Sequence, residues 1–257
     1  MITAKRNDEL DHRLNAREFA DTFNNKMLFN REYAAFVKRD WLYLPHTTKE
    51  EIISFLEKHE SVVVKPIGLS SGRGVELISK VDFLKKYESN KLSGDWLIEE
   101  RVIVHPELQE LNPHSCNTMR VYTLVDNKNT IQILGIYLKV GGGKGICDNF
   151  HNKGIMYNID LVEGIVDRPG LDFALKEHVV HPGTVFIMPG RKIPLFNELK
   201  QCAINAQKQN MHARFIAWDI AITSEGCEII EGNYMPNCNL IQIFDQEGKY
   251  LKIKALI

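Results

Sequence analysis

Three oxygen-bearing side chains near the end of the chain, Asp219, Glu231 and Asn233, are of the types that bind a hard divalent cation. Ala217 and Ala221 share the expected face of Asp219, and such small side chains leave space for a ligand. Two carboxylates that face each other across a sheet destabilise it unless a cation compensates their charge. Mg²⁺ commonly uses one or two carboxylates together with substrate phosphates. These residues therefore predict a magnesium site, and the alternative is a hairpin edge whose carboxylates are simply solvated.

The hairpin that would bring these side chains together can be counted from the turn Ser224-Glu225-Gly226. The segments on both sides of the turn are apolar and predict two antiparallel strands. If the turn is a three-residue loop with glycine in its left-handed position, Thr223 pairs with Cys227. Counting outward then pairs Asp219 with Glu231. The third ligand falls on the same face because side chains alternate with a period of two.

A second candidate site is the stretch VVVKPIGLSSGRGVELI, Val62 to Ile78, where a lysine ends an apolar run ahead of a loop rich in glycine and serine. Pro66 disfavours a helix here. Backbone N–H groups and hydroxyls of such a loop can turn toward an anion, and Lys65 adds a positive charge. The loop matches neither the Walker pattern nor the glycine pattern of dinucleotide-binding folds. A phosphate-binding loop and a glycine-rich hairpin turn both stay open on this pattern alone.

The elements that must position these residues follow from hydrophobic periodicity. A helical entry segment is predicted over residues 9–39, and Thr48 with Glu51 forms a capping box before a short helix. The next elements predict a small α+β lobe, with strands at 61–64, 75–78 and 96–104 and a helix at 81–87. Beyond it the pattern predicts a larger, mostly antiparallel sheet, with strands at 119–125, 131–140, 157–160, 164–167, 213–223 and 227–231 and a helix at 196–209.

Composition limits the classes of function. The chain has 257 residues, 44% hydrophobic and 25% charged, which suits one or two domains with a sizeable core. The formal net charge of −1 gives no global electrostatic reason to expect nucleic acid as a partner. The five cysteines contain no CxxC pair, so neither a zinc site nor a disulfide framework is predicted. We find no signal peptide and no membrane-spanning run, and we expect a cytoplasmic protein without membrane insertion.

The order of these features resembles the ATP-grasp superfamily. The matching stretches are VVVKPIGLSSGRGVELI, WLIEERVIVHPEL, NTMRVYTL, YLKVGG and ARFIAWDIAITSEGCEIIEGN. The chain is most similar to the sugar-transfer-associated ATP-grasp family, through residues 117–123, CDNFHNKGI at 147–155 and HPGT at 181–184. The resemblance implies an α+β fold whose two lobes clasp ATP. The expected parts are a helical segment at 1–45 in place of a Rossmann-like domain, a small lobe at 46–104 and a large lobe at 105–257.

The resemblance also implies nucleotide-binding roles by position. Lys65 looks like the lysine that holds the α and β phosphates of ATP, and Lys26 is similar to an earlier nucleotide-facing lysine. The other implied ligands are Ser70, Ser71 and Gly72 of a mobile lid loop, Glu99, Glu100 and Val102 of an adenine-reading hinge, and Glu107 near the ribose. An exposed helix lysine and a Glu-rich connector are the plain alternatives.

The same resemblance implies charged groups around the transferred phosphate. Arg120 and Lys139 resemble basic groups that face the γ-phosphate or an acyl phosphate. Arg214, five residues before Asp219, is expected to join them from the same side of its strand. The alternative for each is a charge on a half-buried strand. Four polar residues are candidates for an acceptor pocket: Asn149, His151, Asn152 and His181.

These assignments predict an ATP- and Mg²⁺-dependent ligase. It would activate a carboxylate as an acyl phosphate for attack by an amine, a thiol or another nucleophile, in polysaccharide or secondary-metabolite biosynthesis. The expected substrates are small molecules or glycan-linked groups, and a partner from the same pathway is a further expectation. Two alternatives are a phosphotransferase acting on a sugar hydroxyl and a nucleotide-binding regulatory subunit.

Overall fold

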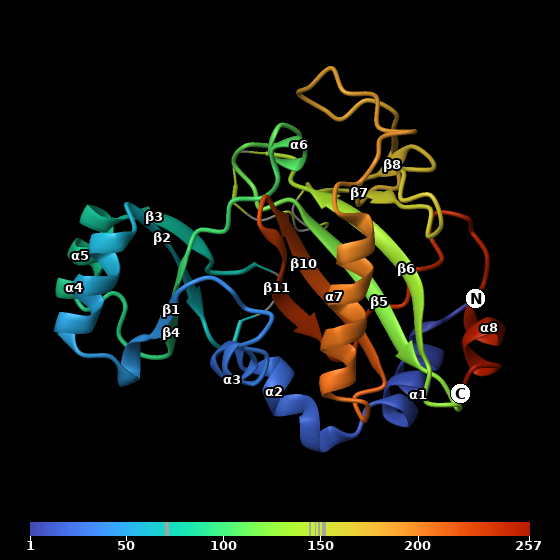
Figure 1. Cartoon of the computed structure of the whole chain (residues 1–257), viewed down its shortest axis with the longest axis horizontal. Coiled ribbons are helices and arrows are strands. Elements are labelled where there is room, and N and C mark those ends of the chain that lie inside the picture. The colour runs from blue at the N-terminus through green and yellow to red at the C-terminus, as the bar shows by residue number, and fades with distance from the viewer. Residues whose placement is uncertain (70–71, 144, 147, 149, 151–152) are drawn as a thin grey trace.

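The computed structural model describes residues 1–69, 72–143, 145–146, 148, 150 and 153–257, and these form two α+β lobes (Figure 1). The α-helices are α1 (Ala4–Leu14), α2 (Ala20–Asn24), α3 (Lys26–Glu32), α4 (Lys49–Lys58), α5 (Lys80–Glu88), α6 (Pro106–Gln109), α7 (Phe196–Gln209) and α8 (Tyr250–Lys254). The strands are β1 (Trp41–Tyr43), β2 (Ser61–Pro66), β3 (Glu76–Ser79), β4 (Trp96–Glu100), β5 (Thr118–Val125), β6 (Ile131–Val140), β7 (Ile155–Asn158), β8 (Gly170–Leu171), β9 (Glu177–His178), β10 (Phe215–Thr223) and β11 (Gly226–Asn233).

The small lobe is a four-stranded antiparallel sheet in the order β1-β4-β2-β3, with α4 and α5 on its outer face (Figure 1). The capping box at Thr48 and Glu51 is confirmed at the start of α4. In β2, Val62 and Val64 are fully buried in the core beneath these helices. Side chains of a strand alternate between faces, so Val63 and Lys65 project from the opposite face, toward the large lobe.

The N-terminal segment is helical as expected, but it is broken into short pieces and it also supplies a strand. Asn25 separates α2 from α3, and its side chain accepts hydrogen bonds from Met27 N and Leu28 N as an N-cap. The strand β1, which was not predicted, pairs with β4 and forms one edge of the small sheet. Residues 41–43 therefore belong structurally with the small lobe. The sequence did not predict this strand, because three residues are too few to show a hydrophobic period.

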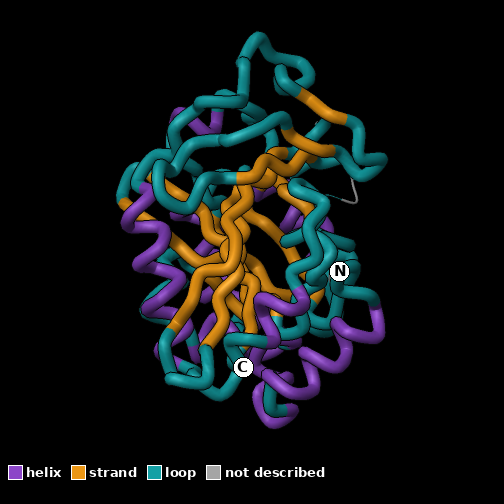
Figure 2. The backbone as a smooth tube through the Cα atoms, turned by 90° about the vertical axis from the view of Figure 1, so that its right-hand side faces the viewer, coloured by secondary structure: helices purple, strands orange, loops and turns teal. Residues whose placement is uncertain are grey.

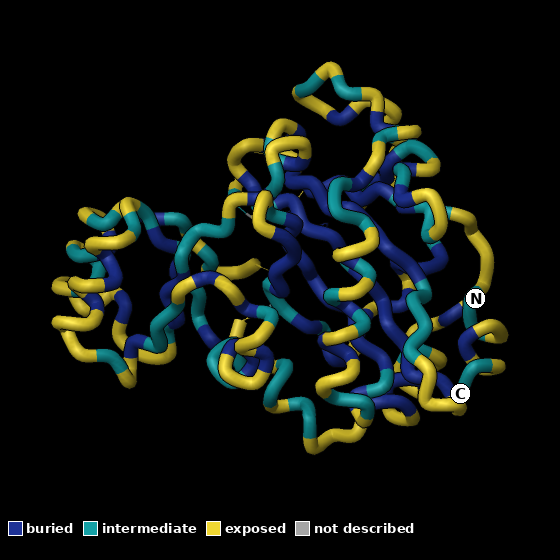
Figure 3. The backbone as a smooth tube through the Cα atoms, in the orientation of Figure 1, coloured by how far each residue is buried: buried dark blue, intermediate teal, exposed yellow. Residues whose placement is uncertain are grey.

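The large lobe is a seven-stranded antiparallel sheet in the order β11-β10-β5-β6-β7-β8-β9, which confirms the predicted type of sheet. Helix α7 covers one face, while α1, α8 and the C-terminal segment cover the other (Figures 1 and 2). A buried polar chain anchors α7: Trp218 Nε1 donates to Thr123 Oγ1 at 2.8 Å, which donates to Gln207 Oε1 at 2.7 Å. Figure 3 shows the central strands buried along most of their length.

The pairing within the last hairpin corrects one step of the sequence analysis and confirms another. Thr223 pairs with Gly226 rather than with Cys227, so the connection has two residues instead of three. A β-bulge between Asp219 and Ile220 then adds one residue on β11 and restores the predicted pair of Asp219 with Glu231. Two shifts of one residue cancel, which is why the facing pair was predicted correctly from a wrong turn.

Among the described residues, none of the helices combines the length and the apolar character needed to cross a bilayer.

Asp11 in α1 yields a prediction about stability and pH. It is 2% exposed, one carboxylate oxygen accepts from Asn7 Nδ2 at 2.6 Å, and among the described residues the other has no hydrogen-bond donor. Burial raises the pKa of Asp11 to about 7. The folded state therefore keeps a proton that the unfolded chain releases near pH 4, and stability falls as pH rises from about 4 to about 7. We expect Asp11→Asn to raise the free energy of unfolding by about 1–3 kcal/mol at pH 8 and to change it little at pH 4.

Urea unfolding of wild type and variant across this pH range measures the effect. Glu9→Gln, at an exposed position of the same helix, is the matched control and should show no such pH dependence. Equal pH profiles for wild type and Asp11→Asn would contradict the buried, protonated state of Asp11.

Candidate active site

A cavity of about 650 Å³ lies between the two lobes. Its walls come from β2, β3 and β4 of the small lobe, from β5, β6, β10 and β11 of the large lobe, and from α2 and α3. The structure brings to this cavity eleven of the predicted site residues: Lys26, Lys65, Gly72, Glu99, Glu100, Val102, Arg120, Lys139, Asp219, Glu231 and Asn233. Cys116 also lines it, and burial raises the pKa of this thiol to about 12, so the thiol stays neutral.

Charged side chains from four neighbouring strands of the large sheet lie together on one face. Asp219 on β10 is paired directly with Glu231 on β11 and with Arg120 on β5. Arg120 binds the Asp219 carboxylate with two nitrogens, Nε to Oδ1 at 2.8 Å and Nη2 to Oδ2 at 2.6 Å. Lys139 Nζ on β6 donates to the same Oδ2 at 3.0 Å. Sheet register, rather than loop conformation, therefore fixes the relative positions of these four groups.

The charges of these four groups are unequally compensated. Burial alone would raise the pKa of Asp219, but Arg120 and Lys139 outweigh it and hold that pKa well below its usual range. Burial and the neighbouring Asp219 charge raise the pKa of Glu231. Glu231 is thus a carboxylate whose ionisation is opposed by its surroundings until a further cation arrives.

The oxygen donors of the hairpin fit a divalent cation. Asn233 lies two residues beyond Glu231, and its Nδ2 donates to Ala217 O at 3.2 Å. That hydrogen bond fixes the amide plane and leaves the carbonyl oxygen as its donor atom for a metal. Two carboxylates and one amide oxygen are the ligand types that suit Mg²⁺.

Asp148 is a site residue that the sequence analysis missed. It accepts a hydrogen bond from Lys139 Nζ at 3.1 Å and is bound on its other oxygen by the backbone N and the hydroxyl of Thr118. Lys139 therefore donates to both Asp148 and Asp219. These two carboxylates raise the pKa of Lys139, although burial acts to lower it. The sequence offered one signal, an acidic residue within CDNFHNKGI, but nothing in it indicated that Lys139, nine residues earlier, is its partner.

The phosphate-lysine candidate Lys65 is held by a carboxylate in this structure. Its ammonium forms an ion pair with Glu99 on the neighbouring strand β4. Glu99 also binds Arg39, whose Nε lies 2.9 Å from Oε2, and accepts from Asn30 Nδ2 at 3.1 Å. Burial would raise the pKa of Glu99, but Arg39 and Lys65 together hold it well below its usual range. Glu99 thus acts through its side chain as the counterion of two cations.

Lys26 contacts the loop that follows β2. Its ammonium donates to the carbonyl oxygens of Pro66 and Ile67, both at 3.1 Å, and of Leu69 at 2.5 Å. Three acceptors match the three donors of an ammonium group, so Lys26 ties α3 to the start of the glycine-rich loop. The predicted lid residues Ser70 and Ser71 lie outside the described residues.

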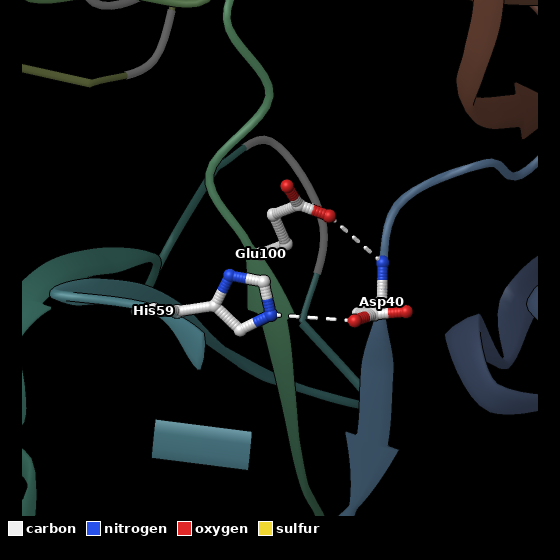
Figure 4. Close-up of side chains that lie close together, drawn as sticks. All are labelled: Asp40, His59 and Glu100. Atoms are coloured by element: carbon white, nitrogen blue, oxygen red, sulfur yellow. Dashed lines mark hydrogen bonds and ion pairs between the residues drawn. The ribbon is translucent and has the colours of Figure 1, made fainter. Parts of the chain in front are cut away.

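The hinge candidate Glu100 lies in a small polar cluster at the C-terminal end of β4 (Figure 4). Its Oε2 accepts from Asp40 N at 3.1 Å, and Asp40 Oδ2 lies 3.4 Å from His59 Nε2. These contacts join the ends of β1 and β4 and orient the Glu100 carboxylate. The strand expected over 96–104 ends at Glu100, and Val102 follows in irregular backbone along the cavity.

Gly232, between Glu231 and Asn233, is required by packing. A Cβ atom at this position would lie 2.9 Å from ring atoms of both Phe23 and Phe29. These rings press against the hairpin as part of an aromatic cluster that reaches Trp218. The glycine of the EGN motif therefore lets α2 and α3 approach the strand that carries the metal-ligand candidates.

Several predicted residues lie away from the cavity. Arg214 precedes β10 and its Nε donates to Val125 O at 3.0 Å, remote from Asp219. The sequence argument for it was wrong, because an odd separation of five residues puts two strand side chains on opposite faces. Glu107 is an exposed residue of α6, and His181 is buried against Tyr157, where burial lowers its pKa to about 4. Three acceptor candidates lie outside the described residues: Asn149, His151 and Asn152.

Solved structures with this fold are ATP-grasp ligases. A biotin carboxylase from Campylobacter jejuni, in a β-γ-ATP complex, has a TM-score of 0.59 at 14% identity, with 92% of this chain and 46% of that chain covered. The ligase PsnB, with a precursor variant, Mg and ADP, has a TM-score of 0.56 at 12% identity, covering 95% and 60%. A D-alanine–D-alanine ligase from Bacillus anthracis has a TM-score of 0.54 at 13% identity, covering 98% and 73%.

These similarities establish the ATP-grasp fold that the sequence predicted. The profile of the family described as sugar-transfer associated ATP-grasp matches residues 5–256, and the chain belongs to this family. The chain spans less than two thirds of the length of the biotin carboxylase and of PsnB. The search of curated proteins found no match.

The buried ion pair of Lys139 with Asp148 predicts a large effect on stability. In Asp148→Asn, the buried ammonium loses one carboxylate and meets an amide, so we expect a loss of about 2–4 kcal/mol in the free energy of unfolding. Urea unfolding measures it. Asp82→Asn is the matched control, because Asp82 pairs with Lys85 where both side chains are more than half exposed, and its loss of stability should be clearly smaller. Equal losses in the two variants would contradict the buried pair.

Proposed function

We propose that the protein is an ATP- and Mg²⁺-dependent ligase that activates a substrate carboxylate as an acyl phosphate. The observation that carries this proposal is the shared cavity. Lys65 from the small lobe and Arg120 and Lys139 from the large lobe face one space together with the carboxylate pair Asp219 and Glu231. Phosphoryl transfer mainly requires positioning and charge neutralisation, which such a set supplies without a side-chain nucleophile.

The reaction has two steps. A carboxylate oxygen of the substrate attacks the γ-phosphorus of ATP, the bond to the β–γ bridging oxygen breaks, and ADP leaves. The nitrogen of an amine, or another nucleophile, then attacks the acyl carbon, the acyl–oxygen bond breaks, and phosphate leaves. In this chain Lys65 binds the phosphates of ATP, while Arg120 and Lys139 stabilise negative charge on the transferred phosphoryl group.

Asp219, Glu231 and Asn233 would hold the metal ion. The ion supplies a positive charge for the β and γ phosphates when it is bound. Support comes from the fold neighbours, since the PsnB structure contains Mg and ADP and the biotin carboxylase is an ATP complex. When Asp219 binds a cation, Lys139 keeps Asp148 as its counterion, so the lysine does not have to leave the site.

The substrates are proposed only by class. The family description concerns sugar transfer, so glycan-linked carboxylates join small carboxylic acids as candidate acceptors. The second substrate is an amine or thiol, in polysaccharide or secondary-metabolite biosynthesis. A cytoplasmic location is part of the proposal, because the reaction consumes ATP.

A screen of carboxylic acids and amines for stimulated ADP release tests the proposal, and mass spectrometry then identifies the product. We expect ADP and phosphate only when both substrates are present. Asp219→Asn and Glu231→Gln should each lower kcat/KM by about 100-fold or more, because each removes an anionic ligand of the metal ion that would neutralise charge on the phosphates. Glu225→Gln, in the exposed turn of the same hairpin, is the matched control and should retain wild-type activity.

The products decide between this ligase and the alternatives. Release of AMP would contradict the acyl-phosphate route. A product that gains one phosphate, with no condensation, would instead show a phosphotransferase. ATP binding without turnover under every substrate pair, together with biological activity that survives Asp219→Asn, would show a regulatory subunit.

A further inference from the structure

Arg39, between α3 and β1, is the most deeply buried cation beside the cavity among the described residues. Its side chain is 2% exposed. On the large lobe, Nη1 lies 2.7 Å from Glu228 Oε1 and donates to Ile229 O at 2.9 Å, and Nη2 donates to Ile230 O at 3.2 Å. Ile230 is the extra residue of the β-bulge that places Glu231 opposite Asp219. Arg39 therefore satisfies carbonyl groups at the irregularity that sets the register of the metal-ligand pair.

The other side of the same guanidinium contacts the small lobe. Nε lies 2.9 Å from Glu99 Oε2, and Nη2 donates to Glu99 Oε1 at 3.1 Å. Arg39 thus lies within ion-pair distance of Oε2 and donates one hydrogen bond to Oε1, and Lys65 is a second cation on Oε2. The Lys65 side chain is 14% exposed against 2% for Arg39, so Lys65 is the partner that can reach a ligand in the cavity.

Removing the counterion of a buried carboxylate is costly. If Lys65 were the only cation on Glu99, its movement to a phosphate would leave that carboxylate buried and unpaired. With Arg39 in place, Glu99 keeps an ion pair and one hydrogen bond when Lys65 departs. Arg39 itself cannot follow the phosphate, because Glu228 and two carbonyl groups hold it on its other side.

We infer that Arg39 is a positioning residue that allows Lys65 to exchange Glu99 for a nucleotide phosphate. This inference rests on the proposed use of ATP. Arg39 touches no phosphate in this scheme, and its effect on nucleotide binding passes through Glu99 and Lys65. If Arg39 only holds the two lobes together, the expected result differs: loss of Arg39 would weaken the binding of adenosine and of ATP equally.

Calorimetric titration with ATP in the presence of Mg²⁺, and with adenosine, separates these roles. For Arg39→Met we expect the Kd of ATP to rise by about tenfold or more, since the phosphates must now compete with Glu99 for Lys65. The Kd of adenosine should stay within about threefold of wild type, because adenosine carries no phosphate. Circular dichroism confirms that the variant is folded. Equal losses for both ligands overturn the inference.

A rescue variant tests the route through Glu99. In Arg39→Met/Glu99→Gln the competing charge is gone, so Lys65 is released and the affinity for ATP should return to within about threefold of wild type. Glu228→Gln removes an ion pair of Arg39 without touching Glu99 and should bind ATP as wild type does. Failure of the double variant to recover, with the fold intact, overturns the inference.

Glu99→Gln alone keeps the inference testable if Arg39→Met does not fold. Removing the carboxylate that competes for Lys65 should lower the Kd of ATP, a result that misfolding cannot produce. A Kd equal to or higher than that of wild type overturns the inference. If the wild-type protein binds neither ATP nor adenosine, the proposed function itself fails. If the wild-type protein binds ATP and Arg39→Met binds it with the same Kd, only the inference about Arg39 fails.

Discussion

Buried charge must be paired, and this constraint organises both the cavity and the joint between the lobes. Asp219, Glu99 and Arg39 each lie almost out of contact with solvent. Each is paired with opposite charges. Arg120 and Lys139 bind Asp219, Arg39 and Lys65 pair with Glu99, and Glu99 and Glu228 pair with Arg39. The desolvation cost of a single unpaired member is several kcal/mol, comparable with the whole stability of a domain. The two lobes therefore meet through buried ion pairs, and removing one member would leave its partner buried without a counterion.

Backbone geometry supplies the precision that these ion pairs need. Asp219, Glu231 and Arg120 occupy one registered row of the antiparallel sheet, and neighbouring strands are held about 5 Å apart by the ladder of hydrogen bonds. Small residues keep this row accessible. Gly232 admits the aromatic rings of α2 and α3, and Ala217 adds little bulk on the face of Asp219. A flexible loop could not fix four charges with comparable accuracy.

The sequence predicted the fold because alternating apolar residues define the strands locally. The pair of Asp219 with Glu231 was counted from a turn of the wrong length, and it is correct because the bulge offsets that error. The two-residue turn and the bulge were not predictable, since a bulge depends on what satisfies its carbonyl groups, and here that is Arg39 from a segment almost two hundred residues away. Asp148 escaped for the same reason, because its partner Lys139 is identified only by three-dimensional proximity.

Ligand binding at such a site is an exchange of partners rather than the filling of a vacant positive pocket. Lys65 is bound to Glu99, Lys26 to three carbonyl groups, and Arg120 to Asp219 before any phosphate arrives. Phosphates gain only the difference between their own contacts and those they displace. Affinity is then governed by how easily each carboxylate can lose one of its cations. In the proposed scheme, a second cation on the same carboxylate, as Arg39 is for Glu99 and Lys139 is for Asp219, lowers that cost.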